Sequence, residues 1–346
     1  MSAKSNYQPP YTITPEILNL VAAISEIMGR LTVISDQSGG GALQLRRINQ
    51  VRTIHGSLAI EGNTLSEAQI TAILEGKRVI APPREVQEVR NAIAVYNRFE
   101  NWKSHSERDL LKAHQILMTG LMNDAGRYRL GGVGVMAGKQ VIHMAPPAGR
   151  VPLLMGNLLR WLATTDAHPL IASSIFHYEF EFIHPFSDGN GRMGRLWQSL
   201  ILASWNPLFA NIPVESLIFE NQQEYYKAIQ ESTRQTDSAA FITFMLRMIL
   251  DAINSLTPQV APHVTPQVVD LLIALQGEMT REMLQSALKL SDRKSFGDRY
   301  LKPALDEGLI ERTIPNKPKS RLQKYRLTNK GFELRPQKKK RQKIAR

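Results

Sequence analysis

The residues best suited to chemistry in this chain lie in one stretch of twelve, from His184 to Arg195, which reads HPFSDGNGRMGR. Apolar residues at helical spacing precede it. Pro185 then forces the chain out of the helix, so we expect His184 at the mouth of a loop. A histidine titrates near neutral pH and can take a proton from a hydroxyl group as that group attacks. The first half of the stretch therefore predicts a general base.

The second half of the stretch predicts an anion site. Gly189, Asn190 and Gly191 lead directly into another predicted helix, where free amides at the helix start attract negative charge. Arg192 and Arg195 lie three residues apart on that helix, so both guanidinium groups can point to one side. Their paired donors suit phosphate oxygens, and we expect phosphate groups as the ligand.

Two residues between the base and the anion site differ in what they can do. Asp188 can hold Mg²⁺ against phosphate groups, which predicts a nucleotide polyphosphate with a divalent cation as the occupant. Ser187 is a poor nucleophile candidate, because no second base stands beside it to form a hydrolytic triad. Each feature alone is common in turns and helix ends, and their fixed order is what favours a functional site.

The composition of the 346 residues excludes several classes of protein. With 43% apolar and 21% charged residues, the chain can bury a core and is not typical of a disordered protein. The absence of cysteine excludes thiol catalysis, disulfide scaffolds and cysteine-ligated zinc. The sequence has neither a long apolar run that could span a bilayer nor the plan of a signal peptide at its start. We expect a soluble, cytoplasmic protein without a membrane partner.

The net charge of +12 is concentrated in the last quarter of the chain. Residues 1–262 carry 23 basic and 22 acidic side chains, whereas residues 263–346 carry 20 and 9. A neutral body joined to a basic module suggests two roles, and the basic module needs a polyanionic partner. We predict DNA binding through residues 263–346, with a module for protein contacts or dimerisation as the alternative.

Helices must position the chemical residues, because apolar side chains recur at helical spacing through most of the chain. The exception is the glycine-rich stretch from Tyr128 to Val151, where β-branched residues alternate about residues 137–140 as the arms of a hairpin do. Such a hairpin must pack on helices or serve as a docking edge. We predict a mainly α fold. One helix should begin at about residue 17, and a second should end at about residue 59. Further helices are expected over 66–75, 85–102, 107–121, 152–164, 169–183, 191–205, 222–233 and 239–255.

A separate small domain is predicted after residues 257–266, a segment with three prolines that we expect to be a linker. Helices should begin near residues 265, 280 and 291, the last ended by a left-handed cap at Gly308. Strands should follow over 309–314 and 321–327. Three helices and a basic hairpin are typical of a winged helix-turn-helix, which we place at 267–330, with a basic tail at 331–346.

The stretch from His184 to Arg195 resembles the signature of the Fic family, His-Pro-Phe-x-Asp/Glu-Gly-Asn-Gly-Arg-x-x-Arg, at every fixed position. The resemblance extends over roughly residues 50–250. It implies a helical Fic core at 106–256 with a hairpin flap, to which Gly-Arg-Tyr-Arg at 126–129 belongs. It also implies transfer of AMP from ATP to a Tyr, Thr or Ser hydroxyl of a target protein, which docks at the flap.

The resemblance implies a role for each part of the signature. His184 would remove the hydroxyl proton, Asp188 would bind Mg²⁺, and the turn Gly189–Gly191 would hold the phosphates. Arg192 and Arg195 would orient the triphosphate so that pyrophosphate leaves in line. The similar Doc phosphotransferases alter the glycines and the first arginine, so the intact turn here favours nucleotidyl transfer.

The nucleotide should also touch residues outside the signature. By the same resemblance, Val135 and Met136 on the flap and Tyr225 and Tyr226 on a later helix contact the nucleotide. Adjacent tyrosines on a helix point in different directions, so one can stack on adenine while the other packs inside.

Residues 57–63, SLAIEGN, are similar to the inhibitory motif Ser/Thr-x-x-x-Glu-Gly/Asn of some Fic enzymes. A helix that ends at Glu61 with Gly62 as its cap presents the carboxylate at its tip. The resemblance implies that Glu61, with Ser57 one turn earlier, belongs to an inhibitory segment within an N-terminal helical region, 1–105. Glu61 would pair with Arg195 and prevent the γ-phosphate from seating.

Three functions are consistent with these patterns. The first is an auto-inhibited protein adenylyltransferase, and the second is a DNA-binding regulator whose site senses a nucleotide. The third is an enzyme that removes AMP, with Glu61 directing water. The complete signature favours an enzyme over a sensor, because a sensor has no evident use for His184. A homodimer is a further arrangement that the sequence leaves open.

Overall fold

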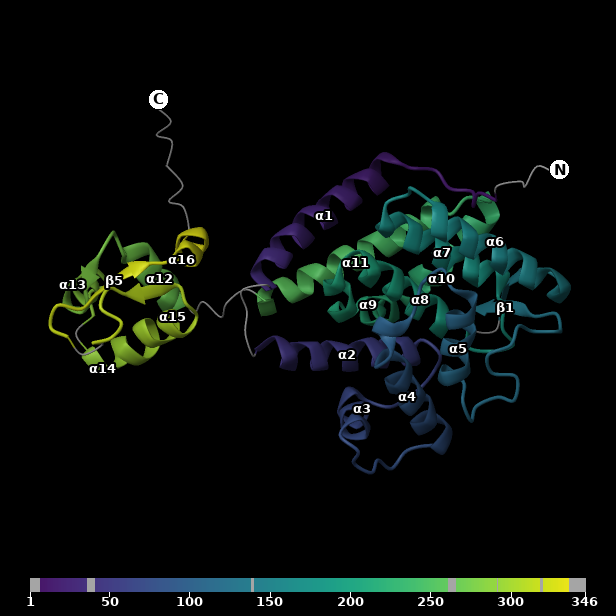
Figure 1. Cartoon of the computed structure of the whole chain (residues 1–346), viewed down its shortest axis with the longest axis horizontal. Coiled ribbons are helices and arrows are strands. Elements are labelled where there is room, and N and C mark those ends of the chain that lie inside the picture. The colour runs from purple at the N-terminus through teal and green to yellow at the C-terminus, as the bar shows by residue number, and fades with distance from the viewer. Residues whose placement is uncertain are drawn as a thin grey trace. The chain divides into compact units, whose positions relative to one another are not determined.

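The computed structural model describes residues 7–35, 41–137, 140–260, 266–290, 292–317 and 320–335. The chain divides into two compact units, residues 1–256 and 257–346, and each is described by itself. The N-terminal unit consists of helices and a hairpin (Figure 1). Its elements are α1 (Pro15–Ser35), α2 (Gly41–Ala59), α3 (Glu67–Leu74), α4 (Pro83–Tyr96), η1 (Phe99–Asn101), α5 (Glu107–Leu117), β1 (Gly134–Ala137), β2 (Gln140–Met144), η2 (Ala148–Arg150), α6 (Val151–Thr164), α7 (Pro169–Ile183), α8 (Asn190–Trp205), η3 (Pro207–Asn211), α9 (Val214–Glu220), α10 (Gln222–Gln235) and α11 (Ala239–Val260).

Helices α7 and α8 pack against each other at the centre of this unit. α7 begins with Pro169 at its first position, and the ring of His168 accepts the amide proton of Leu170. Both helices are buried over most of their length, so each is apolar on more than one face. The core therefore holds both ends of the loop that joins them, which is the first half of the chemical stretch.

Helix α2 crosses α9 and ends beside the start of α8. Gly56 makes the crossing possible, because a Cβ there would stand 2.6 Å from the backbone of Glu215 in α9. The Ser216 hydroxyl donates to the carbonyl of Arg52 at 3.0 Å and fastens the two helices together. The last turn of α2 is thereby held against the core.

The turn after α2 is tied to α4. The side-chain amide of Asn63 donates to Glu88 Oε2 at 2.9 Å and to the carbonyl of Glu85 at 3.2 Å. Thr64 donates its backbone N–H and its hydroxyl to Glu85 Oε2, at 2.6 and 2.8 Å. These bonds place one face of α4 next to the start of α8.

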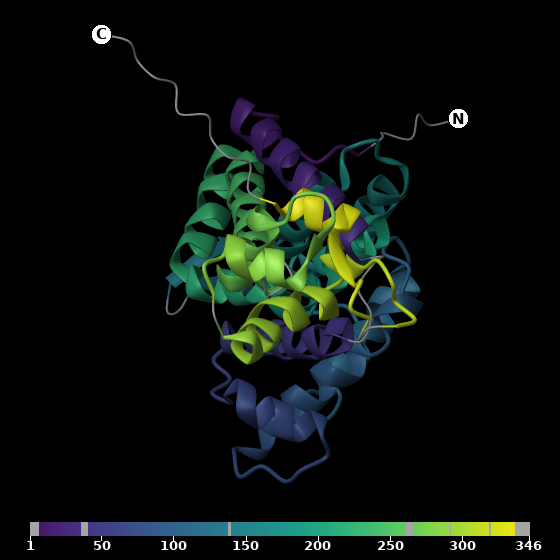
Figure 2. The same ribbon diagram turned by 90° about the vertical axis from the view of Figure 1, so that its left-hand side faces the viewer.

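Residues 7–14, before α1, belong to neither a helix nor a strand. The Tyr7 hydroxyl donates to Glu179 of α7 at 2.6 Å, which fastens this arm to the core. α1 then lies along α11 (Figures 1 and 2), where Arg247 Nε donates to Glu16 at 3.0 Å.

Strands β1 and β2 form the predicted hairpin. They are antiparallel, with Val135 opposite His143 and Met136 opposite Val141, and the register shifts between Val135 and Met136. Residues 138 and 139 of the expected turn lie outside the described residues.

The C-terminal unit packs helices on a small sheet (Figure 2). The strands are antiparallel in the order β3-β5-β4. Leu271 and Leu272 of its first helix, and Leu275 just after that helix, share the core with Phe296 and Tyr325. The elements are α12 (Pro266–Ala274), β3 (Met279–Thr280), α13 (Arg281–Ala287), α14 (Arg293–Phe296), η4 (Gly297–Leu301), α15 (Lys302–Asp306), β4 (Ile310–Arg312), β5 (Lys324–Leu327) and α16 (Asn329–Leu334).

The third predicted helix of this unit is α14, η4 and α15 in succession. The central part, η4, is a π-helical segment beginning at Gly297. Pro303 has no N–H to donate into the helix, which favours such an irregular turn just before it. Gly308 has φ of +63° and supplies the predicted left-handed cap.

The predicted mainly α fold with a hairpin flap is confirmed, and the differences involve short elements. The patterns did not predict β3, α9 or α16, which are too brief to show a period. The helix expected over 85–102 ends at Tyr96, and η1 follows. α11 continues to Val260 and includes the start of the expected linker. Residues 261–265 and 336–346, in the expected linker and tail, lie outside the described residues.

Among the described residues, no helix is both long enough and apolar enough to cross a bilayer.

Candidate functional site

His184 ends α7 in a left-handed conformation, with φ 49° and ψ 63°. Its N–H donates to the Phe180 carbonyl at 2.9 Å, and its own carbonyl accepts from Arg129 Nε at 2.7 Å. The buried Arg129 guanidinium also donates to the carbonyls of Pro146 (2.6 Å) and Ile183 (3.2 Å). A left-handed residue other than glycine persists only where its surroundings enforce it, and Arg129 does so here. Sequence patterns gave no indication of this role for Arg129, although it lies in the Gly-Arg-Tyr-Arg motif at 126–129.

The rest of the loop is closed by polar side chains. Asn190 accepts the N–H of Phe186 and donates to its carbonyl, both at 2.9 Å. His114 of α5 accepts the Gly126 N–H at Nδ1 (2.8 Å), which leaves Nε2 to donate to the Asp188 carbonyl at 3.0 Å. Burial lowers the pKa of His114 to about 4, so it stays neutral and can accept and donate at once. The Asn190 side chain is thus used to hold the shape of the loop.

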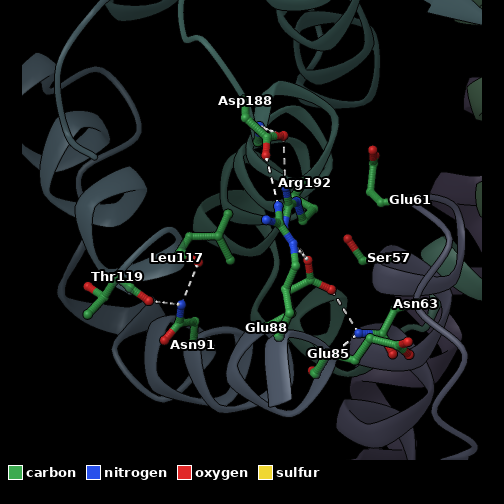
Figure 3. A network of polar contacts seen from close by, with 12 residues as sticks. Ser57, Glu61, Asn63, Glu85, Glu88, Asn91, Leu117, Thr119, Asp188 and Arg192 are labelled. Atoms are coloured by element: carbon green, nitrogen blue, oxygen red, sulfur yellow. Dashed lines mark hydrogen bonds and ion pairs between the residues drawn. The ribbon is translucent and has the colours of Figure 1, made fainter. Parts of the chain in front are cut away.

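Arg192 lies between two carboxylates (Figure 3). Its Nη2 donates to Asp188 Oδ1 at 3.0 Å, and its Nη1 is 3.7 Å from Glu88 Oε1 of α4. Its side chain is 5% exposed, whereas that of Asp188 is 47% exposed. Arg84 of α4 adds a second cation, 3.6 Å from Asp188 Oδ2. Sequence patterns gave no indication of Glu88 or Arg84, which belong to a helix about one hundred residues earlier.

Arg195 is paired with the segment predicted to be inhibitory. Its Nη2 donates to Glu61 Oε1 at 2.7 Å and to the Ser57 carbonyl at 2.9 Å, and its Nε donates to Ser57 Oγ at 3.3 Å. The Arg195 side chain is 1% exposed and that of Glu61 is 35% exposed. Burial by itself would lower the pKa of Arg195, but the charge and hydrogen bond of Glu61, together with Tyr225 and Glu181, outweigh burial and raise it. Arg195 therefore stays cationic inside the core.

Glu61 reaches the first turn of α8. A Cβ at Gly191 would stand 2.5 Å from Glu61 Oε1 and 3.0 Å from Arg195 Nη1. The carboxylate thus lies where the helix start presents its amides, the place at which an anion is expected. The geometry brings an acidic side chain of this chain to the site predicted for phosphate.

The residues predicted to contact the base differ in exposure. Tyr225 is buried, and its hydroxyl donates to His177 Nε2 at 3.1 Å, so it is the tyrosine that packs inside. Tyr226 is half-buried, and its hydroxyl accepts from Gln222 at 3.4 Å. Val135 and Met136 lie on β1 of the hairpin.

The described residues hold no group of three or more His, Cys, Asp or Glu side chains that could bind a metal by themselves. Asp188 nevertheless fits Mg²⁺, because its carboxylate is half exposed and its Oδ1 is held by the Gly189 N–H at 2.6 Å. Mg²⁺ at nucleotide sites takes one or two carboxylates and completes its shell with phosphates and water.

Comparisons with known proteins agree with this geometry. The Fic/DOC family matches residues 104–202, and the C-terminal domain of the Filamentation induced by cAMP protein Fic-like matches residues 266–328. The protein adenylyltransferase Fic of Nematostella vectensis is 31% identical over 205 residues, which are 56% of this chain and 45% of that protein. The chain spans less than half the length of the first curated relatives that it matches.

Solved structures extend the likeness to both units. Fic-1 of C. elegans (residues 134–508) is 26% identical with a TM-score of 0.55, over 68% of this chain and 72% of that one. A Fic family protein from Desulfovibrio desulfuricans G20 is 54% identical with a TM-score of 0.71, over 94% of this chain and 99% of that one. Identity of this degree over nearly the whole of a related structure shows common descent, and the chain belongs to the Fic family.

Proposed function

We propose that this chain transfers AMP from ATP to a hydroxyl side chain of a target protein, and that Glu61 restrains the reaction. The observation that carries the proposal is that one loop brings a base and two cations together. His184 lies where the loop leaves α7, and Arg192 and Arg195 lie on α8, where the loop ends. A base and two phosphate-binding cations at one helix start are what nucleotidyl transfer to a hydroxyl requires. Curated relatives named protein adenylyltransferase support the same reaction.

In this reaction the target hydroxyl gives its proton to His184 while its oxygen attacks the α-phosphorus of ATP. The new bond joins that oxygen to the α-phosphorus, the bond to the β-phosphate oxygen breaks, and pyrophosphate leaves. The amides at residues 189–191 and the guanidinium groups of Arg192 and Arg195 hold the phosphates in line for this exchange. When bound, Mg²⁺ would neutralise phosphate charge, and Asp188 is the residue that would hold it.

The target protein would dock at the flap. The two-stranded sheet of β1 and β2 leaves a strand edge, and an extended segment of a partner can pair with such an edge. The flap belongs to the same unit as the loop, and Arg129 ties the Pro146 carbonyl just beyond β2 to His184. A hydroxyl presented on a docked segment would be delivered to the base.

A second partner is proposed for the C-terminal unit. We propose that residues 263–346 bind DNA, as a winged helix-turn-helix, because they carry 20 basic and 9 acidic side chains. Three helices followed by an antiparallel β4–β5 pair are the elements that such a module needs.

The reaction is tested with ATP labelled at the α-phosphate. Label that becomes covalently attached to protein in a lysate supports transfer, and mass spectrometry of the product names the target and the modified residue. Binding of ATP at one equivalent without transfer would support the nucleotide sensor. Loss of AMP from a modified protein without net addition would support the AMP-removing enzyme, in which Glu61 directs water.

A further inference from the structure

A second buried carboxylate lies beside His184. Glu181 is 5% exposed and stands one turn before His184 on α7, with Oε2 3.8 Å from His184 Nδ1. Its other oxygen, Oε1, is buried without a hydrogen-bond partner among the described residues. A Cβ at Gly194 would stand 2.8 Å from His177 Cδ2 and 2.9 Å from Glu181 Oε1. Glycine at that position of α8 therefore makes room for both side chains and lets the carboxylate lie buried against the helix.

His177, the other histidine near this carboxylate, cannot be its charged partner. His177 Nδ1 is 2.6 Å from Gln198 Oε1, which can only accept, so Nδ1 carries the proton. Its Nε2 accepts the Tyr225 hydroxyl at 3.1 Å and is 3.9 Å from Glu181 Oε1. Burial lowers the pKa of His177 to about 3, so it remains neutral. His184 is therefore the histidine that can donate a hydrogen bond to Glu181 and carry a charge beside it.

We propose that Glu181 is a positioning residue for His184. Glu181 orients the ring by accepting a hydrogen bond from Nδ1–H. The inference rests on the proposed function, because it assigns how the general base is prepared. With the proton held on Nδ1, Nε2 is the ring nitrogen whose lone pair takes the proton of the target hydroxyl. The product imidazolium then has a carboxylate beside it. Within the pair of His184 and Glu181, the only change is that Nε2 gains the hydroxyl proton. The 3.8 Å separation shortens when substrates seat, as hydrogen bonds of catalytic groups do.

The charge on Glu181 depends on the groups that face it. These are His177 and His184 on its own helix, Arg195 on α8, Glu61 after α2, and Tyr225 and Tyr226 on α10. The pKa of Glu181 is raised to about 8; burial is the main cause, the charge of Glu61 adds to the rise, and Arg195 acts against it.

Two consequences follow for the pH dependence of transfer. Ionised Glu181 accepts a stronger hydrogen bond from Nδ1–H than the neutral carboxyl group does and stabilises the imidazolium, so transfer should increase as pH rises through the pKa of this carboxyl group. Removing the Glu61 carboxylate removes one cause of the raised pKa and moves that increase to lower pH.

The experiment compares Glu181→Gln with Glu179→Gln, both in a Glu61→Gly background. Glu179 is a matched control, because it lies on the same helix, is 6% exposed and bonds to Tyr7 instead of His184. We expect Glu181→Gln to lower kcat about 10- to 100-fold at a pH above the pKa of the carboxyl group, with KM for ATP unchanged. The step of the pH–rate profile that belongs to the carboxyl group should disappear. Glu179→Gln should keep both rate and profile.

A readout independent of transfer is the titration of the His184 ring followed by nitrogen NMR. In the parent protein the ring and Glu181 titrate as a coupled pair in two steps, and in Glu181→Gln the ring titrates in one step. The inference is overturned if Glu181→Gln, folded as judged by its melting curve, matches Glu179→Gln in kcat, pH profile and NMR titration. If the parent Glu61→Gly protein transfers no AMP, the proposed function fails, and the NMR titration still decides whether Glu181 and His184 are coupled.

Discussion

Replacing Glu61 with glycine should release the site and raise the rate of AMP transfer. In the structure Glu61 Oε1 accepts from Arg195 Nη2 at 2.7 Å and lies over the first turn of α8. A triphosphate that needs Arg195 and the helix amides must therefore displace this carboxylate. Glycine removes both the ion pair and the occupying atoms, while the rest of the inhibitory segment is still held to α4 through Asn63 and Thr64.

The size of the increase follows from the pair that is lost. A hydrogen bond to a charged group contributes about 1.5–3 kcal/mol when buried, and exposure reduces this. Arg195 is fully buried but the Glu61 side chain is 35% exposed, which places the pair near the lower end, about 1.5–2 kcal/mol. Since about 1.4 kcal/mol is a factor of ten, we expect a rise of roughly 10- to 30-fold in the rate.

The assay measures label from α-labelled ATP on the enzyme itself and on proteins of a lysate. Ser57→Ala is a graded comparison, because it removes the 3.3 Å bond to Arg195 Nε but keeps the 2.9 Å bond to the Ser57 carbonyl, and it should give a smaller rise. The double change Glu61→Gly with Arg195→Ala should lose the gain, since the released group is itself required. A Glu61→Gly protein that melts as the parent does and transfers AMP no faster would refute the reasoning.

The remaining predictions concern the base, the basic module and a buried acid. His184→Ala should lower transfer by about 10²- to 10⁴-fold while ATP binding, measured by calorimetry, stays nearly unchanged; a rate equal to that of the parent would remove His184 from the mechanism. The full chain should retard DNA at low salt with an affinity that falls steeply as salt rises, and absence of a shift at every protein concentration would contradict the DNA proposal. Burial raises the pKa of Glu215 to about 7, so the folded state holds a proton that the unfolded state, with its ordinary value of 4.5, has lost. The stability that this group contributes is present below pH 4.5 and is lost as pH rises to 7. The unfolding free energy of Glu215→Gln, compared with that of the parent, should therefore rise over that window by up to about 1 kcal/mol per pH unit. A difference that stays constant with pH would contradict this prediction.

The sequence by itself determined the parts that are contiguous. The stretch from His184 to Arg195 could be recognised because its base, turn and arginines lie within one loop and one helix, where spacing along the chain sets spacing in space. Long helices showed their period, and the predicted hairpin formed. The pair of Glu61 with Arg195 followed from family resemblance, because no local pattern connects residues so far apart.

Only the tertiary structure decided which distant residues complete the site. Glu88 reaches Arg192 because Asn63 ties the end of α2 to α4, and neither contact leaves a periodic trace in the sequence. Glu181 stands one turn before His184 in any helix, but its burial depends on α8 packing closely at Gly194. Removal from water gives that carboxyl group its raised pKa, and removal from water is a property of the packed core rather than of the local sequence.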